Sequence, residues 1–216
     1  MDIMYSIVKF FVAGGAFMYP ILLVFAIAAA IAVERFVTLT RVRSRNETSW
    51  RKLQPALAEG EFEKAREMTE DDASTVSRLL GTGLARQGAV RRREDIEIAM
   101  EESMMEIIPQ LEKRTAYVAL GANVATLLGL LGTIIGLIQA FTAVANANPA
   151  EKADLLSASI SVAMNTTAFG LVVAIPLLVT HSVLTAKTGE IVDGLEMVSV
   201  KALNVISTLA KRQVQA

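Results

Sequence analysis

The sequence has 216 residues but no cysteine, a single histidine (His181) and no G-x-x-x-x-G-K-S/T pattern. A chain without thiols forms no disulfide, thiolate nucleophile or cysteine-ligated metal site, and one histidine cannot build a histidine metal cluster. Without the glycine-rich pattern there is no P-loop to hydrolyse a nucleotide. The net charge is only −1, from 21 basic and 22 acidic residues, so there is no overall attraction to nucleic acid. We therefore expect a protein that is not an enzyme and has no cofactor or metal.

Charged residues are also missing from three long stretches of the chain. No Asp, Glu, Lys or Arg occurs in 10–33, 115–150 or 155–186. An α-helix needs roughly 20 apolar residues to cross the hydrocarbon core of a bilayer, and each stretch is longer than that. Basic residues follow the first stretch rather than precede it, which is the opposite of a secretory signal, so we expect this stretch to remain as a span. The sequence therefore predicts an integral membrane protein with three transmembrane helices.

The basic residues predict the orientation of these spans. Of the 21 Lys and Arg residues, 19 lie in 35–114 or after residue 186. Because cytoplasmic segments have the excess of positive charge, we expect the long loop and the C-terminal tail in the cytoplasm and the N-terminus outside. The predicted fold is all-α, with long helices extending from the membrane into a helical cytoplasmic domain. Its segments are an interfacial amphipathic helix (1–16), transmembrane helix 1 (17–36), a cytoplasmic helical domain (37–114), transmembrane helix 2 (115–145), a periplasmic turn (146–154), transmembrane helix 3 (155–183) and a cytoplasmic C-terminal helix (184–216).

Local patterns divide the predicted cytoplasmic domain into helices. Apolar spacing predicts one helix over 53–68 with a turn at Glu59-Gly60, and a second helix over 74–87. A third helix begins near Glu94, and apart from a kink at Pro109 nothing interrupts its apolar stripe before the second span. We therefore predict one continuous helix from Glu94 through the second span, about 75 Å long.

Small residues form two ridges on the second span, in which successive members are four positions apart. One ridge is Gly121, Ala125 and Gly129, and the other is Gly132, Gly136 and Ala140. Small residues at this spacing let helix backbones approach closely in lipid. We therefore predict that Gly129, Gly132 and Gly136, together with Gly170 in the third span, serve helix packing. Because a three-span subunit has few internal partners for two ridges, we expect them to make contacts between subunits.

Polar side chains occur at two places in the spans. Asn165, Thr166 and Thr167 are consecutive in the third span, and Thr133 lies in the second. A hydroxyl can bond to the carbonyl one turn back at little cost, but an amide in hydrocarbon should face protein or a water-filled path. Asn165, Thr166 and Thr167 are therefore expected to face protein or a water-filled path, and together with Thr133 they are our candidates for an ion pathway. No span has a charged residue in its interior, so a second chain is expected to supply any carboxylate that ion transport needs.

Three blocks of sequence resemble the MotA/TolQ/ExbB ion-channel family, and the similarity is closest to its three-span ExbB/TolQ branch. The blocks are MYPILL at 18–23 leading to ERF at 34–36, then LGLLGTIIGL at 128–137, then TAFGLVVAIP at 167–176. They occur in the family's order, and the similarity covers nearly the whole chain.

The resemblance implies a homopentamer in the bacterial inner membrane around the single spans of two ExbD/TolR-type partner chains. An Asp of the partner would bind and release the ion, ion flow would turn the pentamer, and a TonB/TolA-like protein would transmit the force. The resemblance also implies that Thr133 and Thr167 are pore threonines. The branch has Glu five residues before the second threonine, where this chain has Val162. It usually has Ala directly before that threonine, where this chain has Thr166.

The function predicted from these observations is an ion-channel or stator subunit that converts the transmembrane ion gradient into mechanical work. H⁺ is the default ion. Na⁺ is the alternative, because the hydroxyl of Thr166 adds a hard oxygen of the kind that suits this ion. The missing Glu leaves a second hypothesis open, in which the chain is a non-conducting membrane scaffold or signalling subunit with the same fold.

Overall fold

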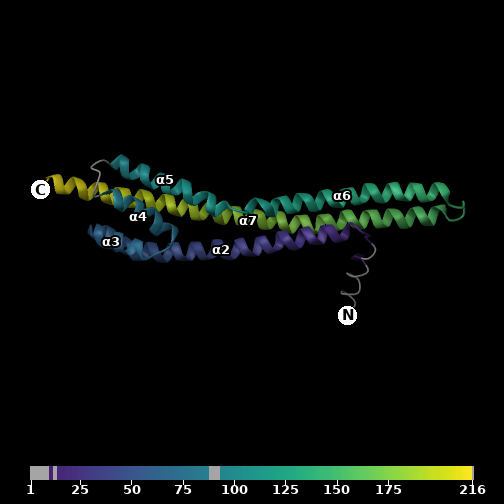
Figure 1. The fold of residues 1–216 in the computed structure, drawn as a ribbon, viewed down its shortest axis with the longest axis horizontal. Helices are drawn as coiled ribbons and strands as arrows, with labels where there is room; N and C mark the ends of the chain where they lie inside the picture. The colour runs from purple at the N-terminus through teal and green to yellow at the C-terminus, as the bar shows by residue number, and fades with distance from the viewer. Residues whose placement is uncertain (1–9, 12–13, 88–92, 216) are drawn as a thin grey trace, which may run out of the picture. The chain divides into compact units, whose positions relative to one another are not determined.

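The computed structural model describes residues 10–11, 14–87 and 93–215, and this part of the chain is helical without strands (Figure 1). Three helical stretches are long and apolar enough to cross a membrane, as predicted: Met18–Glu59, Arg93–Asn146 and Lys152–Thr208. Most of the predicted amphipathic helix 1–16 lies outside the described residues. The helices are α2 (Met18–Glu59), α3 (Phe62–Glu70), α4 (Thr75–Gln87), α5 (Arg93–Glu112), α6 (Thr115–Asn146) and α7 (Lys152–Gln215).

The chain forms two compact units, and α2 and α7 contribute residues to both. The first, which we call the span unit, consists of Met1–Glu34 and Arg114–Val183. The second, which we call the charged unit, consists of Arg35–Lys113 and Leu184–Ala216. All of the predicted ion-pathway residues belong to the span unit.

The prediction of one continuous helix from Glu94 through the second span is wrong. Helix α5 ends at Glu112, and α6 begins at Thr115 after Arg114 adopts a left-handed backbone conformation with φ 67°. Helix ends in this conformation usually have glycine at that position. Because an arginine occupies it here, the sequence contains no glycine that would signal the break. Side chains of α2 contact both sides of the break. Arg35 donates from Nη2 to the carbonyl of Leu111 at 2.6 Å, and Glu34 pairs with Arg114 at 3.8 Å.

The span unit is held together by small residues in contact. Helices α6 and α7 run antiparallel (Figure 1), and a Cβ added at Gly129 would lie 3.3 Å from the Cα atoms of both Gly170 and Thr167. Gly136 faces Ala163 in the same way, and Gly121 faces Ala28 of α2. The glycines that were predicted to serve helix packing thus lie against neighbouring helices of the same chain. The expectation that the ridges make contacts between subunits rests on a shortage of surfaces for them within a single subunit. That argument no longer holds, since both ridges pack against helices of the same subunit.

The charged unit is a helical bundle of α3, α4, α5 and parts of α2 and α7, with large apolar side chains in its core. Helix α2 contacts α4 through Asn46, whose Oδ1 accepts a hydrogen bond from the Thr75 hydroxyl at 2.8 Å. It also contacts α7, where Lys187 donates to the Thr40 hydroxyl at 2.8 Å. Helix α5 contacts both α4 and α7. Fully buried side chains of this unit include Leu39, Leu53, Leu57, Leu79, Leu80, Met100, Ile107, Leu184 and Leu195.

Two turns of the charged unit were visible in the sequence. The chain turns at Gly60, whose φ of 79° suits glycine, so the predicted break after Glu59 is confirmed. Helix α4 begins at Thr75, close to the predicted start of the second helix. The hydroxyl of Ser74 accepts the backbone N–H of Ser77 at 3.1 Å, which caps this helix. The carboxylate of Asp72 accepts hydrogen bonds from the hydroxyls of Ser49, Ser74 and Ser77.

Candidate functional site

Two of the predicted pathway residues meet in the middle of the span unit. Thr133 of α6 and Thr167 of α7 are hydrogen-bonded through their hydroxyls. The carbonyl of Gly129 accepts from Thr167 at 3.0 Å and from Thr133 at 3.1 Å, and the carbonyl of Ala163 lies 3.4 Å from the Thr133 hydroxyl. The close approach of α6 and α7 at Gly129 and Gly170 places the two threonines within reach of each other.

This pair forms a cluster of oxygen atoms with few hydrogens. Two hydroxyl hydrogens are shared among two hydroxyl oxygens and the carbonyls of Gly129 and Ala163. Both threonines are half-buried. A hydroxyl can also rotate to act as a donor. The cluster can therefore accept a hydrogen bond from a protonated carboxyl group, donate one to a carboxylate, or offer oxygens to a cation.

Thr166 lies elsewhere, although it is the neighbour of Thr167 in the sequence. Its hydroxyl donates to the carbonyl of Gly14 at 2.7 Å and lies 3.0 Å from that of Val162, and the residue is 2% exposed. Its methyl group covers Gly132. The structure therefore gives Thr166 a local role, because it connects the turn at Gly14 to α7.

Asn165 also lies apart from the threonine pair. Successive residues of an α-helix are about 100° apart, so Asn165 and Thr167 are separated by about 200° around α7. Asn165 is half-buried, and its amide makes no hydrogen bond within the part of the chain that the structure describes. It shares its side of α7 with Ser161, which is exposed. The four predicted pathway residues thus divide into one pair and two residues that point in other directions.

Two polar residues of α6 were missed in the sequence. Asn123 and Thr126 are both exposed, and both lie on the side of α6 that bears Thr133. The signal was present, since Thr126 and Thr133 are seven residues apart, close to two helical turns. Asn123 lies three residues before Thr126, on the same stripe.

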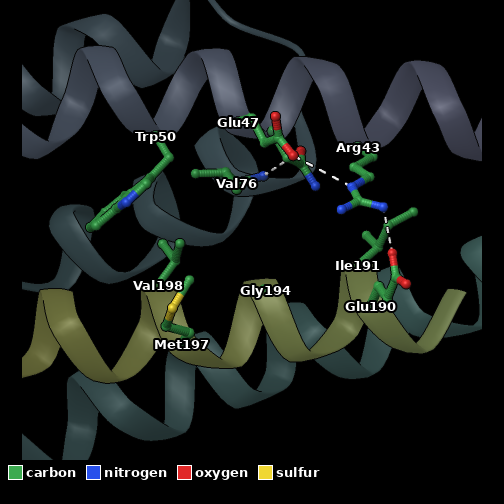
Figure 2. A pocket seen from close by; sticks show the side chains of 10 residues that line it. Arg43, Glu47, Trp50, Val76, Glu190, Ile191, Gly194, Met197 and Val198 are labelled. Atoms are coloured by element: carbon green, nitrogen blue, oxygen red, sulfur yellow. Dashed lines mark hydrogen bonds and ion pairs between the residues drawn. The ribbon is translucent and has the colours of Figure 1, made fainter. Parts of the chain in front are cut away.

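The charged unit contains a pocket between α2, α4 and α7 (Figure 2). It encloses about 180 Å³ and combines charged residues with apolar ones: Arg43, Asn46, Glu47, Trp50, Val76, Glu190, Ile191, Gly194, Met197 and Val198. Arg43 is paired with both Glu190 and Glu47 across its rim, so its charge is neutralised. No group of three His, Asp or Glu side chains that could hold a metal occurs among the described residues.

Comparisons of the sequence with known proteins show which proteins this chain is similar to. The profile of the MotA/TolQ/ExbB proton channel family matches residues 71–197, a range that contains both threonines. An ExbB homolog of Methanothermobacter thermautotrophicus, named a biopolymer transport protein, is 29% identical over 203 residues, which cover 89% of this chain and 68% of that protein. An ExbB-like biopolymer transport protein of Synechocystis sp. is 29% identical over 189 residues, or 85% of this chain and 72% of the relative. The Tol-Pal system protein TolQ of Haemophilus influenzae is 33% identical over 93 residues, or 43% of this chain and 40% of TolQ.

Proposed function

Because the chain belongs to the MotA/TolQ/ExbB proton channel family, we propose that it is the ion-conducting stator subunit of a motor in the bacterial inner membrane. The motor converts the transmembrane ion gradient into mechanical work together with an ExbD/TolR-type partner. The observation that supports this proposal is the Thr133–Thr167 cluster, which lies in a part of the chain without charged residues.

The hydroxyl pair suits a path on which the charge belongs to another chain. A partner Asp in its protonated form finds acceptors in the cluster, and in its ionised form finds a hydroxyl that can donate. The wall itself stays neutral, so the ion is not held permanently. Moving one elementary charge through 100 mV provides about 2.3 kcal/mol, which is enough to bias a rotary step.

The assembly and its orientation follow the family resemblance. We propose a homopentamer around the spans of two partner chains, with the charged unit in the cytoplasm and the turn at 147–151 outside. The distribution of Lys and Arg supports this orientation. A TonB/TolA-like protein would transmit the force across the envelope. The glycine ridges no longer support the pentamer, because their contacts lie within the subunit.

H⁺ is the ion that we propose. The argument for Na⁺ depended on the oxygen of Thr166, and this oxygen bonds to the carbonyl of Gly14 in a buried position away from the cluster. Activity that rises with external Na⁺, at fixed membrane potential and pH, would reverse this choice.

The alternative function is a non-conducting scaffold or signalling subunit. The observation that favours it is Val162 at the position of the family Glu. A Cβ added at Gly15 would lie 3.2 Å from a methyl group of Val162, so this side chain lies against the N-terminal turn. A scaffold would assemble with its partner but carry no current that depends on Thr133 and Thr167.

The test is to remove the two hydroxyls while the volume is kept. We expect the double variant Thr133→Val, Thr167→Val to lose ion flux almost completely, because Val has nearly the volume of Thr but cannot hydrogen-bond. The measurement is potential-driven flux in liposomes that contain the full chain and its ExbD/TolR-type partner, with native mass measurement of the assembly. The chain without the partner should conduct very little.

Matched controls exist on the same helices. Thr142 of α6 and Thr180 of α7 bond only to the carbonyl one turn back in the described structure, at 2.9 and 2.8 Å. Thr142 lies about 180° around α6 from Thr133, and Thr180 lies about 220° around α7 from Thr167. The variants Thr142→Val and Thr180→Val should retain flux. The variant Thr133→Ser, which keeps a hydroxyl at this position, should retain part of the flux that Thr133→Val loses. Full flux in the double variant would refute the proposed path, whereas absence of flux in the unmodified protein with its partner would favour the scaffold.

A further inference from the structure

Asn123 is the least expected side chain on the exposed surface of the span unit. It follows Arg114 by nine residues, which places it about 14 Å along α6 from the last charged group. Its side chain is exposed, and its amide makes no hydrogen bond within the described chain. An amide has four hydrogen-bonding positions and is costly to leave in hydrocarbon. Something outside the subunit must therefore satisfy it.

The direction of Asn123 connects it with the threonine pair. On a helix with 3.6 residues per turn, Thr126 is offset by about 60° and Thr133 by about 80° from Asn123, all to the same side. The three residues form a polar stripe about 15 Å long, which we call the α6 stripe. Thr126 is exposed, and its hydroxyl bonds to the carbonyl of Ala122 at 3.1 Å. Its oxygen has further lone pairs, so it can still accept a hydrogen bond.

Helix α7 offers no polar side chain beside the part of the α6 stripe that contains Thr126 and Asn123. Because the helices are antiparallel, Gly170 lies against Ala125, and Leu177 lies near Gly121. From Ala168 to Val179 the sequence of α7 contains only apolar residues. Between the threonine pair and the level of Asn123, the polar side chains that α6 and α7 offer are therefore those of α6.

We propose that Asn123 and Thr126 continue the ion path from the Thr133–Thr167 pair towards the Arg114 end of α6, and that they hydrogen-bond the water along which the ion moves. This inference rests on the proposed function, in which the Arg114 end faces the cytoplasm. It assigns the α6 stripe to the inner half of the path. The hydroxyl pair then exchanges the ion with the partner Asp. The amide of Asn123 hydrogen-bonds water in the inner half of the path and so keeps this half hydrated.

The absence of cysteine makes a direct test of water access simple. Single variants Asn123→Cys and Thr126→Cys, in the full chain assembled with its partner, would be treated with a charged, membrane-impermeant methanethiosulfonate reagent. The matched control is Leu131→Cys. Leu131 is 43% exposed but lies about 140° around α6 from Thr126 and about 80° from Asn123, on the side away from Thr133, and we expect it to face lipid. We expect labelling at Asn123 and Thr126 to be at least about tenfold faster than at Leu131, because the reagent reacts with a thiol that water can reach.

A functional measurement separates a role in the path from a role in assembly. We expect Asn123→Leu to lower potential-driven flux about tenfold, the loss expected for roughly one hydrogen bond, while the native mass of the assembly is unchanged. Asn123→Ser, which keeps a hydrogen-bonding group, should recover part of the flux.

Two results would overturn the inference. The first is labelling at Asn123 and Thr126 that is no faster than at Leu131. The second is loss of the assembly in Asn123→Leu, which would show that the amide bonds to a neighbouring subunit. Either result leaves the proposed function standing as long as the Thr133→Val, Thr167→Val variant loses flux. Flux in that variant would instead refute the proposed function itself.

Discussion

The span unit and the charged unit are both helical, but different contacts hold them together. In the span unit, glycine and alanine bring helix backbones into contact, as at Gly129 and Gly170. In the charged unit, large apolar side chains fill the core and polar side chains cap the helices. Of the largest fully buried side chains in the described residues, only Met18, Ile21 and Val118 belong to the span unit.

The difference follows from the solvent for which each sequence is suited. Water drives large apolar side chains into the core of the charged unit. Lipid tails are as apolar as leucine, so burying leucine there yields little, and helices associate through close packing and hydrogen bonds. A small residue is therefore essential at a helix contact in the span unit, and of little consequence on an exposed helix face in the charged unit. The glycines of the two units allow this contrast to be tested.

The largest effect is expected for Gly170→Leu. A Cβ at Gly170 would lie 2.8 Å from the carbonyl oxygen of Ala125 and 3.2 Å from the Cα of Gly129, and neither backbone atom can move aside alone. The helices must separate, which should cost at least about 3 kcal/mol and break the Thr133–Thr167 contact. Thermal unfolding in detergent measures the loss. The control is Gly189→Leu in α7, where nothing lies within 4 Å of an added Cβ. Equal losses in both variants would remove the distinction between the units.

An intermediate effect on stability is expected for a substitution at Asp72 in the charged unit. This effect should depend on pH, because it involves a titrating carboxyl group. Burial by itself raises the pKa of this carboxyl, but hydrogen bonds from Ser49, Ser77 and Ser74 outweigh it and hold the pKa below its ordinary value. A lowered pKa stabilises the fold fully above the unfolded value, near pH 4, and this contribution is lost as the pH falls through the folded value. We expect Asp72→Asn to cost about 1 kcal/mol at pH 7 and to flatten the loss of stability in acid.

The measurement for Asp72 is unfolding of the charged unit's helices as a function of pH, followed by circular dichroism. The unmodified protein should lose stability as the pH falls below about 5. The Asp72→Asn variant should lose less stability over the same pH range. Curves that stay parallel would show that the serine cluster does not stabilise the ionised carboxylate.

The smallest effect, and one of opposite sign, is expected for Gly189→Ala. Glycine in a helix interior is less favourable than alanine by roughly 0.5–1 kcal/mol, and the added methyl group meets no atom within 4 Å. The variant should therefore be slightly more stable than the unmodified protein in the same thermal assay. Destabilisation would indicate that a partner covers this part of α7.

Much of the architecture could be predicted because it depends on local composition. The three spans follow from the absence of charge, and the turn after Glu59 follows from Gly60, whose positive φ is cheap for glycine. The break at Arg114 could not be predicted, since an arginine adopts the left-handed conformation only where its surroundings enforce it. Here Arg35 bonds to the carbonyl of Leu111 and Glu34 pairs with Arg114, both from a helix distant in the sequence.

The candidate site divides in the same way. The sequence alone determined that Thr133 and Thr167 are polar residues in charge-free spans, and that Gly129 and Gly170 allow close helix contact, because these properties belong to residue types and spacing. Only the tertiary structure decided that the two hydroxyls bond to each other while Thr166 turns to Gly14. Neighbours on a helix point about 100° apart, so which of them faces the path depends on how α6 and α7 are rotated against each other. That rotation is set by the contact of Gly129 with Gly170, which joins residues 41 positions apart.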